Sequence, residues 1–214
     1  MIIVTGASSG IGQALYSYFL KSGEYVVGVS RRGPDLCLDL SNPKDTFKLK
    51  GWIVSNDEKV DCLINNAGVM LFENVCSSLE IQSMVQLNLV TIDSLHRLIF
   101  PHMRMGVGSI INIASSAGIT AEAEMPLYSA IKAGIHVMTR AYAKLFAPGI
   151  RVNCISPGLF DTNLVEGDTP QDLINAVPLK RIGQPEEIVP VVDLLLKCKY
   201  MTGANLIIDG GLCA

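Results

Sequence analysis

A tyrosine and a lysine lie one helical turn apart in the segment that begins near Leu127. A period of 3.6 residues puts these side chains on one helical face: Tyr128, Ile131, Lys132, Ile135, Thr139 and Tyr142. The face is largely apolar, and a buried ammonium group needs a partner or loses its charge. Two interpretations are open: Lys132 reaches solvent past a core tyrosine, or the pair performs acid/base chemistry.

The chemical interpretation depends on what the lysine does to the phenol. A tyrosine with its ordinary pKa of about 10 is almost fully protonated at neutral pH. A cation about 4 Å away, at an effective dielectric constant of about 20, contributes roughly 4 kcal/mol and brings that pKa to about 7. The sequence therefore predicts that Lys132 makes Tyr128 a general acid/base near neutral pH.

Two further polar positions belong to the same hypothesis. Ser115 and Ser116 follow an apolar strand at 109–114, at the end of the sheet where open α/β folds bind ligands. A hydroxyl there could polarise a carbonyl, and a serine-rich loop is the alternative. Asn88 lies on the apolar face of a predicted helix, where asparagine is disfavoured, so we expect it to bond something, for structure or for function.

The amino-terminal stretch predicts a phosphate site. An apolar strand at 2–4 leads through Gly6, Gly10 and Gly12 into a helix that begins near Ile11. Such a turn aims backbone N–H groups and the positive end of a helix at an anion, and the glycines allow close approach. A glycine-rich turn without a ligand is the alternative.

The elements that must position these residues alternate along the chain. Predicted strands lie at 2–4, 25–30, 36–39, 60–65, 109–114, 151–156 and 205–209, and predicted helices at 11–21, 42–55, 79–103, 127–146 and 185–197. The alternation predicts an α/β fold, a doubly wound parallel sheet within a single domain over 1–214. Residues 31–35 are too few for the usual connecting helix, so we expect a short third strand there. The polar segment at about 161–183 is predicted to form a lid.

Composition excludes several classes of protein. The 214 residues are 49% hydrophobic and 17% charged, with a net charge of −3, which favours a sheet buried on both faces over nucleic-acid or anionic-membrane binding. No apolar run reaches the ~18 residues of a membrane-spanning helix. Six cysteines without CxxC pairs indicate reduced thiols in the cytoplasm, and we expect neither disulfides nor a metal.

The motifs together resemble those of the short-chain dehydrogenase/reductase family, over nearly the whole chain. The matching segments are Thr5–Gly12 (TGxxxGxG), Asn65–Gly68 (NNAG), Ser115, Tyr128–Lys132 (YxxxK), Pro157–Thr162 (PGxxxT) and Asp209–Gly211 (DGG). Each motif alone is weak, but six occur in the family's order, with its spacing between Ser115 and Tyr128.

The resemblance implies a Rossmann-type sheet of about seven strands in the order 3-2-1-4-5-6-7, with helices on both faces. It implies an oxidoreductase that interconverts a ketone or aldehyde and an alcohol. Asn88, Ser115, Tyr128 and Lys132 would form the catalytic tetrad. Ser115 would orient the oxygen, Tyr128 would exchange its proton, Lys132 would hold the nicotinamide ribose, and Asn88 would anchor a water in a proton relay.

The resemblance also implies which residues contact a nicotinamide dinucleotide. They are Gly6, Ser8, Ser9, Gly10, Ile11, Gly12, Ser30, Arg31, Arg32, Asp39, Leu40, Asn66, Ala67, Gly68, Tyr128, Lys132, Pro157, Gly158, Phe160 and Thr162. An acidic residue at the end of the second strand would favour NAD(H). The chain has Ser30 followed by Arg31 and Arg32, and guanidinium groups suit a 2′-phosphate, so we predict NADP(H).

Two alternatives to an NADP(H)-dependent carbonyl reductase are a sugar-nucleotide epimerase or dehydratase and a non-catalytic NADP(H)-binding sensor. The short chain argues against the first, and the intact tetrad against the second. The family's oligomers, usually dimers or tetramers built on two long helices, imply a homodimer or homotetramer here. Residues alone leave the carbonyl or alcohol substrate unidentified.

Overall fold

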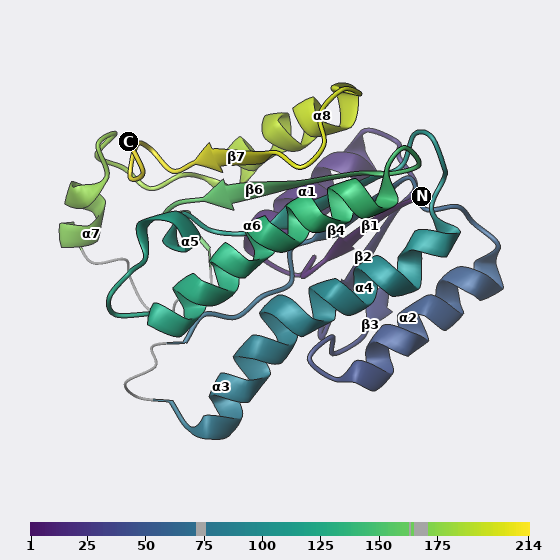
Figure 1. Cartoon of the computed structure of the whole chain (residues 1–214), viewed down its shortest axis with the longest axis horizontal. Coiled ribbons are helices and arrows are strands. Elements are labelled where there is room, and N and C mark those ends of the chain that lie inside the picture. Colours follow the sequence, from purple (N-terminus) through teal and green to yellow (C-terminus); the bar gives the residue numbers. More distant parts are fainter. Residues whose placement is uncertain (72–75, 163, 165–170) are drawn as a thin grey trace.

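The computed structural model describes residues 1–71, 76–162, 164 and 171–214 (Figure 1). Within these ranges the sheet consists of β1 (Ile2–Thr5), β2 (Val26–Ser30), β3 (Leu36–Cys37), β4 (Cys62–Asn65), β5 (Ser109–Ile113), β6 (Arg151–Pro157) and β7 (Asn205–Ile208). Every neighbouring pair is parallel, and the order is β3-β2-β1-β4-β5-β6-β7. The predicted strand order is confirmed.

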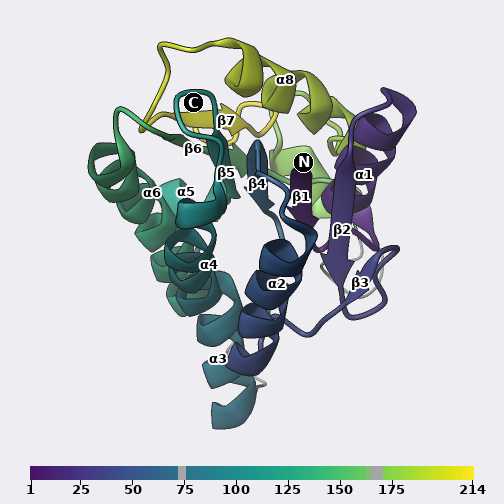
Figure 2. The same ribbon diagram turned by 90° about the vertical axis from the view of Figure 1, so that its right-hand side faces the viewer.

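Helices cover both faces of the sheet, as Figure 2 shows. On one face, α2 (Pro43–Asn56), α4 (Thr91–Ile99) and α6 (Pro126–Phe146) bury apolar residues against the strands. On the other face, α1 (Gly10–Lys21) and α8 (Val189–Lys197) do the same. The inner strands β1, β2, β4 and β5 are buried on both faces between these helical layers, which explains why their sequences are largely apolar.

The carboxyl ends of the strands meet at one end of the molecule. The arrows of β6 and β7 point toward α5 (Ala117–Thr120) and α7 (Gln171–Ala176), and the chain's carboxyl terminus lies there too (Figure 1). Loops after parallel strands therefore share this edge, where ligands of open α/β sheets bind. Of the predicted lid at 161–183, residues 163 and 165–170 lie outside the described residues.

The connection from β2 to β3 contains no helix, as the sequence predicted. The loop folds back onto the strand: the Asp35 carboxylate accepts a 2.8 Å hydrogen bond from the Gly28 backbone and a 3.3 Å bond from the Tyr16 hydroxyl. Strand β3 is two residues shorter than the predicted 36–39. The side chain of Asp35 thus satisfies a backbone donor on β2 beside a very short outer strand.

The long helix predicted over 79–103 is present, but it is not α-helical throughout. The segment consists of α3 (Ser78–Val85), the π-helical turn η2 (Gln86–Val90), α4 and the 3₁₀ turn η3 (Phe100–His102). The Asn88 amide donates to the Met84 carbonyl at 2.9 Å, four residues earlier, and so competes with the backbone for the bond that an α-helix needs. A π-turn at such a position often marks a functional site.

The helix predicted from Pro185 differs only at its start. A 3₁₀ turn, η4 (Pro185–Ile188), precedes α8. Proline suits the first turn of either helix, because its missing N–H is not needed there. The proline pattern therefore predicted the start of the segment but not its hydrogen-bonding type.

Candidate active site

Helix α6 turns the predicted face toward the core. Tyr128 is 4% exposed and Lys132 is 6% exposed, and Ile131, Ile135 and Thr139 on the same face are also buried. The opposite face exposes small residues, among them Ala130 and Ala141. Because Lys132 is buried, it does not reach solvent past the tyrosine, and its part in acid/base chemistry stays a prediction.

The Lys132 ammonium group lies between the end of β5 and the tyrosine ring. Its Nζ donates to the Ile113 carbonyl at 3.3 Å and lies 5.5 Å from the centroid of the Tyr128 ring. Burial lowers the pKa of Lys132 to about 8, because a desolvated ammonium group favours its neutral form. Lys132 is therefore mostly charged at neutral pH and titrates just above it.

The Tyr128 phenol does not have the lowered pKa that the sequence argument predicted. Burial raises the pKa of Tyr128 to about 12, and a hydrogen bond from Ser115 opposes that rise. Desolvation of the phenolate is the largest cause of this rise, and Lys132 is not among the groups that lower the pKa. Tyr128 consequently holds its proton at neutral pH.

Of the two serines after β5, Ser115 is the one that bonds Tyr128. Its Oγ also accepts a 3.2 Å bond from the Ala117 N–H, which holds the hydroxyl at the start of α5. Ser116 is buried, and its N–H donates to the Pro157 carbonyl at 2.8 Å. The two hydroxyls, Ser115 Oγ and the phenol, can therefore bond the same carbonyl oxygen.

Asn88 connects the π-turn to the loop after β4. Its amide donates to the Val69 carbonyl at 2.7 Å, and its Oδ1 accepts from the Val69 N–H at 3.3 Å. A Cβ on Gly68 would lie 2.6 Å from Asn88 Oδ1 and 3.8 Å from Lys132 Nζ, so only glycine fits between these side chains. The asparagine is thus a satisfied structural residue, and its role in a water relay stays a prediction.

The turn after β1 has the geometry of a phosphate cradle. Gly6 and Gly10 have φ of +69° and +51°, a conformation that favours glycine. A Cβ on Gly12 would lie 2.2 Å from the Gly6 carbonyl oxygen. Ser9 caps α1 without a side-chain hydrogen bond, and the first turn of α1 contains no acidic residue. The uncapped N–H groups of this twelve-residue helix suit an anionic ligand.

Thr162 lies over this turn, because a Cβ on Gly10 would come within 2.9 Å of its side chain. A cavity of about 770 Å³ opens beside it, lined by Ser8, Ser9, Gly10 and Thr162 together with residues of α1 and η4. Its lining does not include Ser115, Tyr128 or Lys132. The cavity therefore adjoins the glycine turn after β1 and not the Tyr128 phenol.

The end of β2 presents the groups that the sequence predicted for a 2′-phosphate. Ser30 is 9% exposed, and its hydroxyl has no hydrogen-bond partner among the described residues. Arg31 and Arg32 are exposed, and neither forms an ion pair within the described part of the chain. A buried hydroxyl without a described partner, next in sequence to two exposed guanidinium groups without a described ion pair, suits a phosphate group.

The other predicted contacts fall into three groups. Asp39 accepts from the Ser41 backbone and hydroxyl at 3.0 and 2.6 Å, while Leu40 is buried under α4. Pro157 ends β6 and Gly158 follows it, at the same edge as Ser115. Ile11 and Phe160 pack against the core on the α1 side, so the structure brings their side chains to that core and not to the phenol.

Thr5 is a positioning residue that the predictions of site residues omitted. Its hydroxyl accepts from the backbone N–H groups of Asn66 and Ala67 at 2.9 and 3.0 Å and donates to the Ile64 carbonyl at 3.2 Å. The Asn66 amide in turn donates to the Thr5 carbonyl at 3.0 Å. The signal was available, because Thr5 is a polar residue at the end of an apolar strand.

A buried network beneath the site also escaped the sequence analysis. Asn112 of β5 accepts from the Asn65 amide at 2.8 Å, lies 3.0 Å from His96 Nε2 and donates to Thr139 at 2.9 Å. The network joins β4, β5, α4 and α6, which carry the residues of the candidate site. Its signal in the sequence was a polar asparagine in each of two largely apolar strands, Asn65 in β4 and Asn112 in β5.

Two classes of feature are absent from the described residues. No helix there combines the length and apolarity needed to cross a bilayer. Across the same ranges, no three His, Cys, Asp or Glu side chains gather as they would around a metal ion.

Comparison with known proteins covers the whole chain. Residues 6–213 match the profile of a family described as enoyl-(acyl carrier protein) reductase. The chain is 32% identical to L-fucose dehydrogenase of Bos taurus over 238 residues, covering 99% of this chain and 88% of the relative. A 4-hydroxyisoleucine dehydrogenase complexed with NADH has a TM-score of 0.90 at 29% identity, covering 99% of this chain and 97% of that one. A blue fluorescent protein from a metagenomic library, in complex with NADPH, has a TM-score of 0.91 at 26% identity, covering 100% and 97%.

The glycine turn gives a prediction with a matched control. Gly12→Ala would force a methyl group against backbone, so we expect about 1–3 kcal/mol of destabilisation and at least tenfold weaker NADPH binding. Gly51→Ala in α2 meets nothing within 4 Å and should stabilise by about 0.5–1 kcal/mol without changing NADPH affinity. Urea denaturation and NADPH fluorescence titration measure both. Equal behaviour of the two variants would contradict the close packing assigned to this turn.

Proposed function

Because the chain belongs to the short-chain dehydrogenase/reductase family, we propose that it reduces a ketone or aldehyde to an alcohol with NADPH, and that Tyr128 is its general acid. One observation carries the proposal. A buried ammonium group, a buried phenol and a serine hydroxyl converge at the carboxyl end of β5. Such a group of side chains is expensive to bury and suits proton transfer to a carbonyl oxygen.

Each residue has a role that follows from its contacts. Ser115 Oγ, held by the Ala117 N–H, donates to the substrate carbonyl oxygen and orients it. Tyr128 delivers its proton to the same oxygen, and the Lys132 charge stabilises the phenolate that remains. The Gly6–Gly12 turn and the residues after β2 would hold the dinucleotide, which supplies the hydride chemistry when bound. Asn88 fixes the loop that separates it from Lys132.

The two pKa values favour carbonyl reduction at neutral pH. A phenol with a pKa of about 12 is protonated there and can act as an acid, while a lysine with a pKa of about 8 still carries its charge. The reverse reaction needs the phenolate as base, and that form becomes more abundant only as pH rises. Near pH 7 the phenol is therefore in the form that carbonyl reduction requires.

The preference for NADP(H) is supported by the end of β2. Solved relatives bind NADH or NADPH, so likeness alone does not choose between them. Here Ser30 ends the strand and Arg31 and Arg32 follow it, so none of these three positions carries a carboxylate to bond a ribose 2′-hydroxyl. Both guanidinium groups are exposed, and a dianionic phosphate is the ligand group that they fit best.

Removal of one oxygen atom tests the proposed function. Tyr128→Phe should lower kcat for NADPH-dependent ketone reduction by about 10²–10⁴-fold while leaving the affinity for NADPH within about twofold. Tyr25→Phe, at an exposed tyrosine, is the matched control and should keep full activity. NADPH oxidation at 340 nm with a panel of ketones measures the rates. Unchanged turnover by Tyr128→Phe would contradict the assignment of the general acid.

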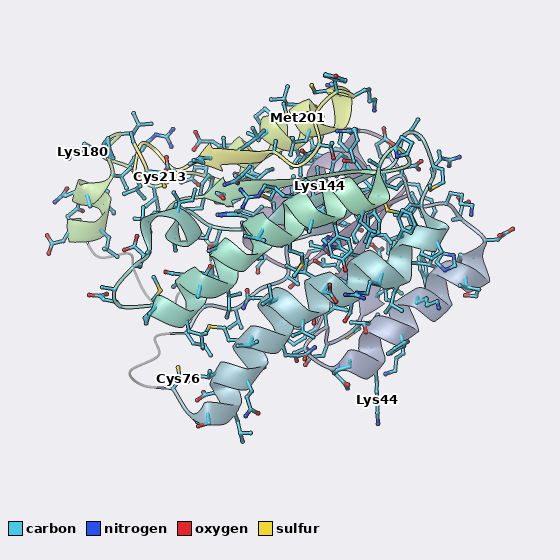
Figure 3. All side chains as sticks on the ribbon, in the orientation of Figure 1. Lys44, Cys76, Lys144, Lys180, Met201 and Cys213 are labelled. Atoms are coloured by element: carbon cyan, nitrogen blue, oxygen red, sulfur yellow. The ribbon has the colours of Figure 1, made fainter. Side chains whose placement is uncertain are left out.

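Charge reversal tests the cofactor preference. Arg31→Asp removes a phosphate ligand and adds a repelling carboxylate, so the KM for NADPH should rise at least tenfold while the KM for NADH stays level or falls. Lys44→Asp makes a similar charge change where Lys44 projects from α2 into solvent (Figure 3) and should alter neither constant. An unchanged NADPH constant in Arg31→Asp would overturn the NADP(H) assignment.

A further inference from the structure

A group of apolar side chains, which we call the collar, packs against Tyr128. Met84, Ala117, Tyr128 and Ile131 form one buried cluster. The partly exposed side chains that pack against it include Val69, Met70, Leu71, Met125 and Leu127. They come from two segments, the loop after β4 and the start of α6, which flank Ser115 and Tyr128 in the fold. On the proposed function, a substrate whose carbonyl bonds Ser115 and Tyr128 would extend past these partly exposed apolar side chains.

Polar groups of the adjoining loop are already engaged with one another. The Thr120 hydroxyl donates to the Glu122 carboxylate at 2.5 Å, and the Ser129 hydroxyl accepts from the Glu122 N–H at 3.1 Å. The charges that this loop adds, Glu122 and Glu124, are both negative. The loop therefore offers no cation to an anionic substrate, and its hydroxyls serve the fold of the loop.

The two cations that follow α7 also have hydrogen-bond acceptors within the chain. Lys180, beside α7 in Figure 3, donates to the Asn175 carbonyl at 2.7 Å. Arg181 forms two 2.7 Å hydrogen bonds with the Glu187 carboxylate, one from each terminal nitrogen. A bidentate pair of this kind leaves little of the guanidinium group for a substrate carboxylate or phosphate.

We propose that the substrate is an uncharged ketone whose carbonyl is flanked by alkyl or aryl groups. The inference rests on the proposed function and goes beyond it by naming the substrate class. Aliphatic and thioether side chains cannot pair the hydroxyl groups of a sugar, and each buried hydroxyl without a partner weakens binding. Flexible methionines adapt to varied apolar shapes, so we expect several alkyl and aryl ketones to be accepted.

Matched probes in one assay test the substrate class. We expect the wild-type chain with NADPH to show at least tenfold higher kcat/KM for 4-tert-butylcyclohexanone than for 4-oxocyclohexanecarboxylate. In the oxidative direction, we expect kcat/KM with NADP⁺ to be higher for 4-tert-butylcyclohexanol than for L-fucose. The cyclohexanones share a ring and a carbonyl, so the comparison isolates the effect of the charged group.

Polar substitutions in the collar connect that selectivity to named residues. Met70→Gln and Met125→Gln keep side-chain length and should raise the KM for 4-tert-butylcyclohexanone at least fivefold, with the KM for NADPH unchanged. Met125→Leu should retain the wild-type selectivity. Met105→Gln is the matched control, because Met105 is 59% exposed and precedes β5 at the opposite edge of the sheet. Circular dichroism and Tm establish that each variant folds. If a variant does not fold, the comparison of substrates on the wild-type chain still tests the substrate class.

The outcomes separate the two proposals. A wild-type preference for the carboxylate or for L-fucose overturns the substrate class while leaving the proposed function intact. Collar variants that match the wild-type chain in every constant overturn the assignment to these residues. If no ketone or alcohol of either kind is turned over, the proposed function itself fails.

Discussion

The burial of a lysine ammonium group beside a tyrosine ring is the constraint on which the rest of the site depends. Lys132 Nζ has a backbone carbonyl of β5 as its hydrogen-bond acceptor, and no carboxylate neutralises it among the described ion pairs. Desolvation therefore pushes its pKa down and that of Tyr128 up. A pair held in this way costs stability, and residues that break the rules of core packing usually do so for function.

Parallel strand topology brings the supporting residues to this pair. The loops after β1, β4, β5 and β6 all leave the same edge of the sheet, so residues far apart in the chain meet there. The Thr5 hydroxyl ties the loop after β4 to the end of β1, and Asn88 ties that loop to the π-turn. Gly68 lies between Asn88 and Lys132, where a side chain would not fit. Hydrogen bonds from side chains to the backbone thus set the spacing of Tyr128, Lys132 and the glycine turn.

Much of this arrangement could be predicted from the sequence, because strands buried on both faces and glycine turns leave strong local patterns. The parallel sheet, the buried face of α6 and the missing helix after Ser30 followed from these patterns and are confirmed. The strand order came from the family resemblance and is confirmed too. The π-turn was missed because it depends on the Asn88 side chain, whose partners on the Val69 backbone are remote in sequence. The pKa of Tyr128 was wrong because desolvation depends on how completely the tertiary structure encloses the ring. The apolar periodicity of a helix predicts which of its faces is buried, but it does not predict how completely a side chain on that face is enclosed.

The pH dependence of kcat/KM for ketone reduction tests most directly whether the buried ammonium group supports proton transfer from Tyr128. A lysine whose pKa is lowered to about 8 carries its charge below that pH and loses it as pH rises. The wild-type rate should therefore be level near pH 7 and fall about tenfold per pH unit well above pH 8. Lys132→Met should be slower and lack this fall, while Lys144→Met, at an exposed lysine of the same helix, should keep it. A wild-type rate that stays level to about pH 10, or a fall that persists in Lys132→Met, would contradict the account.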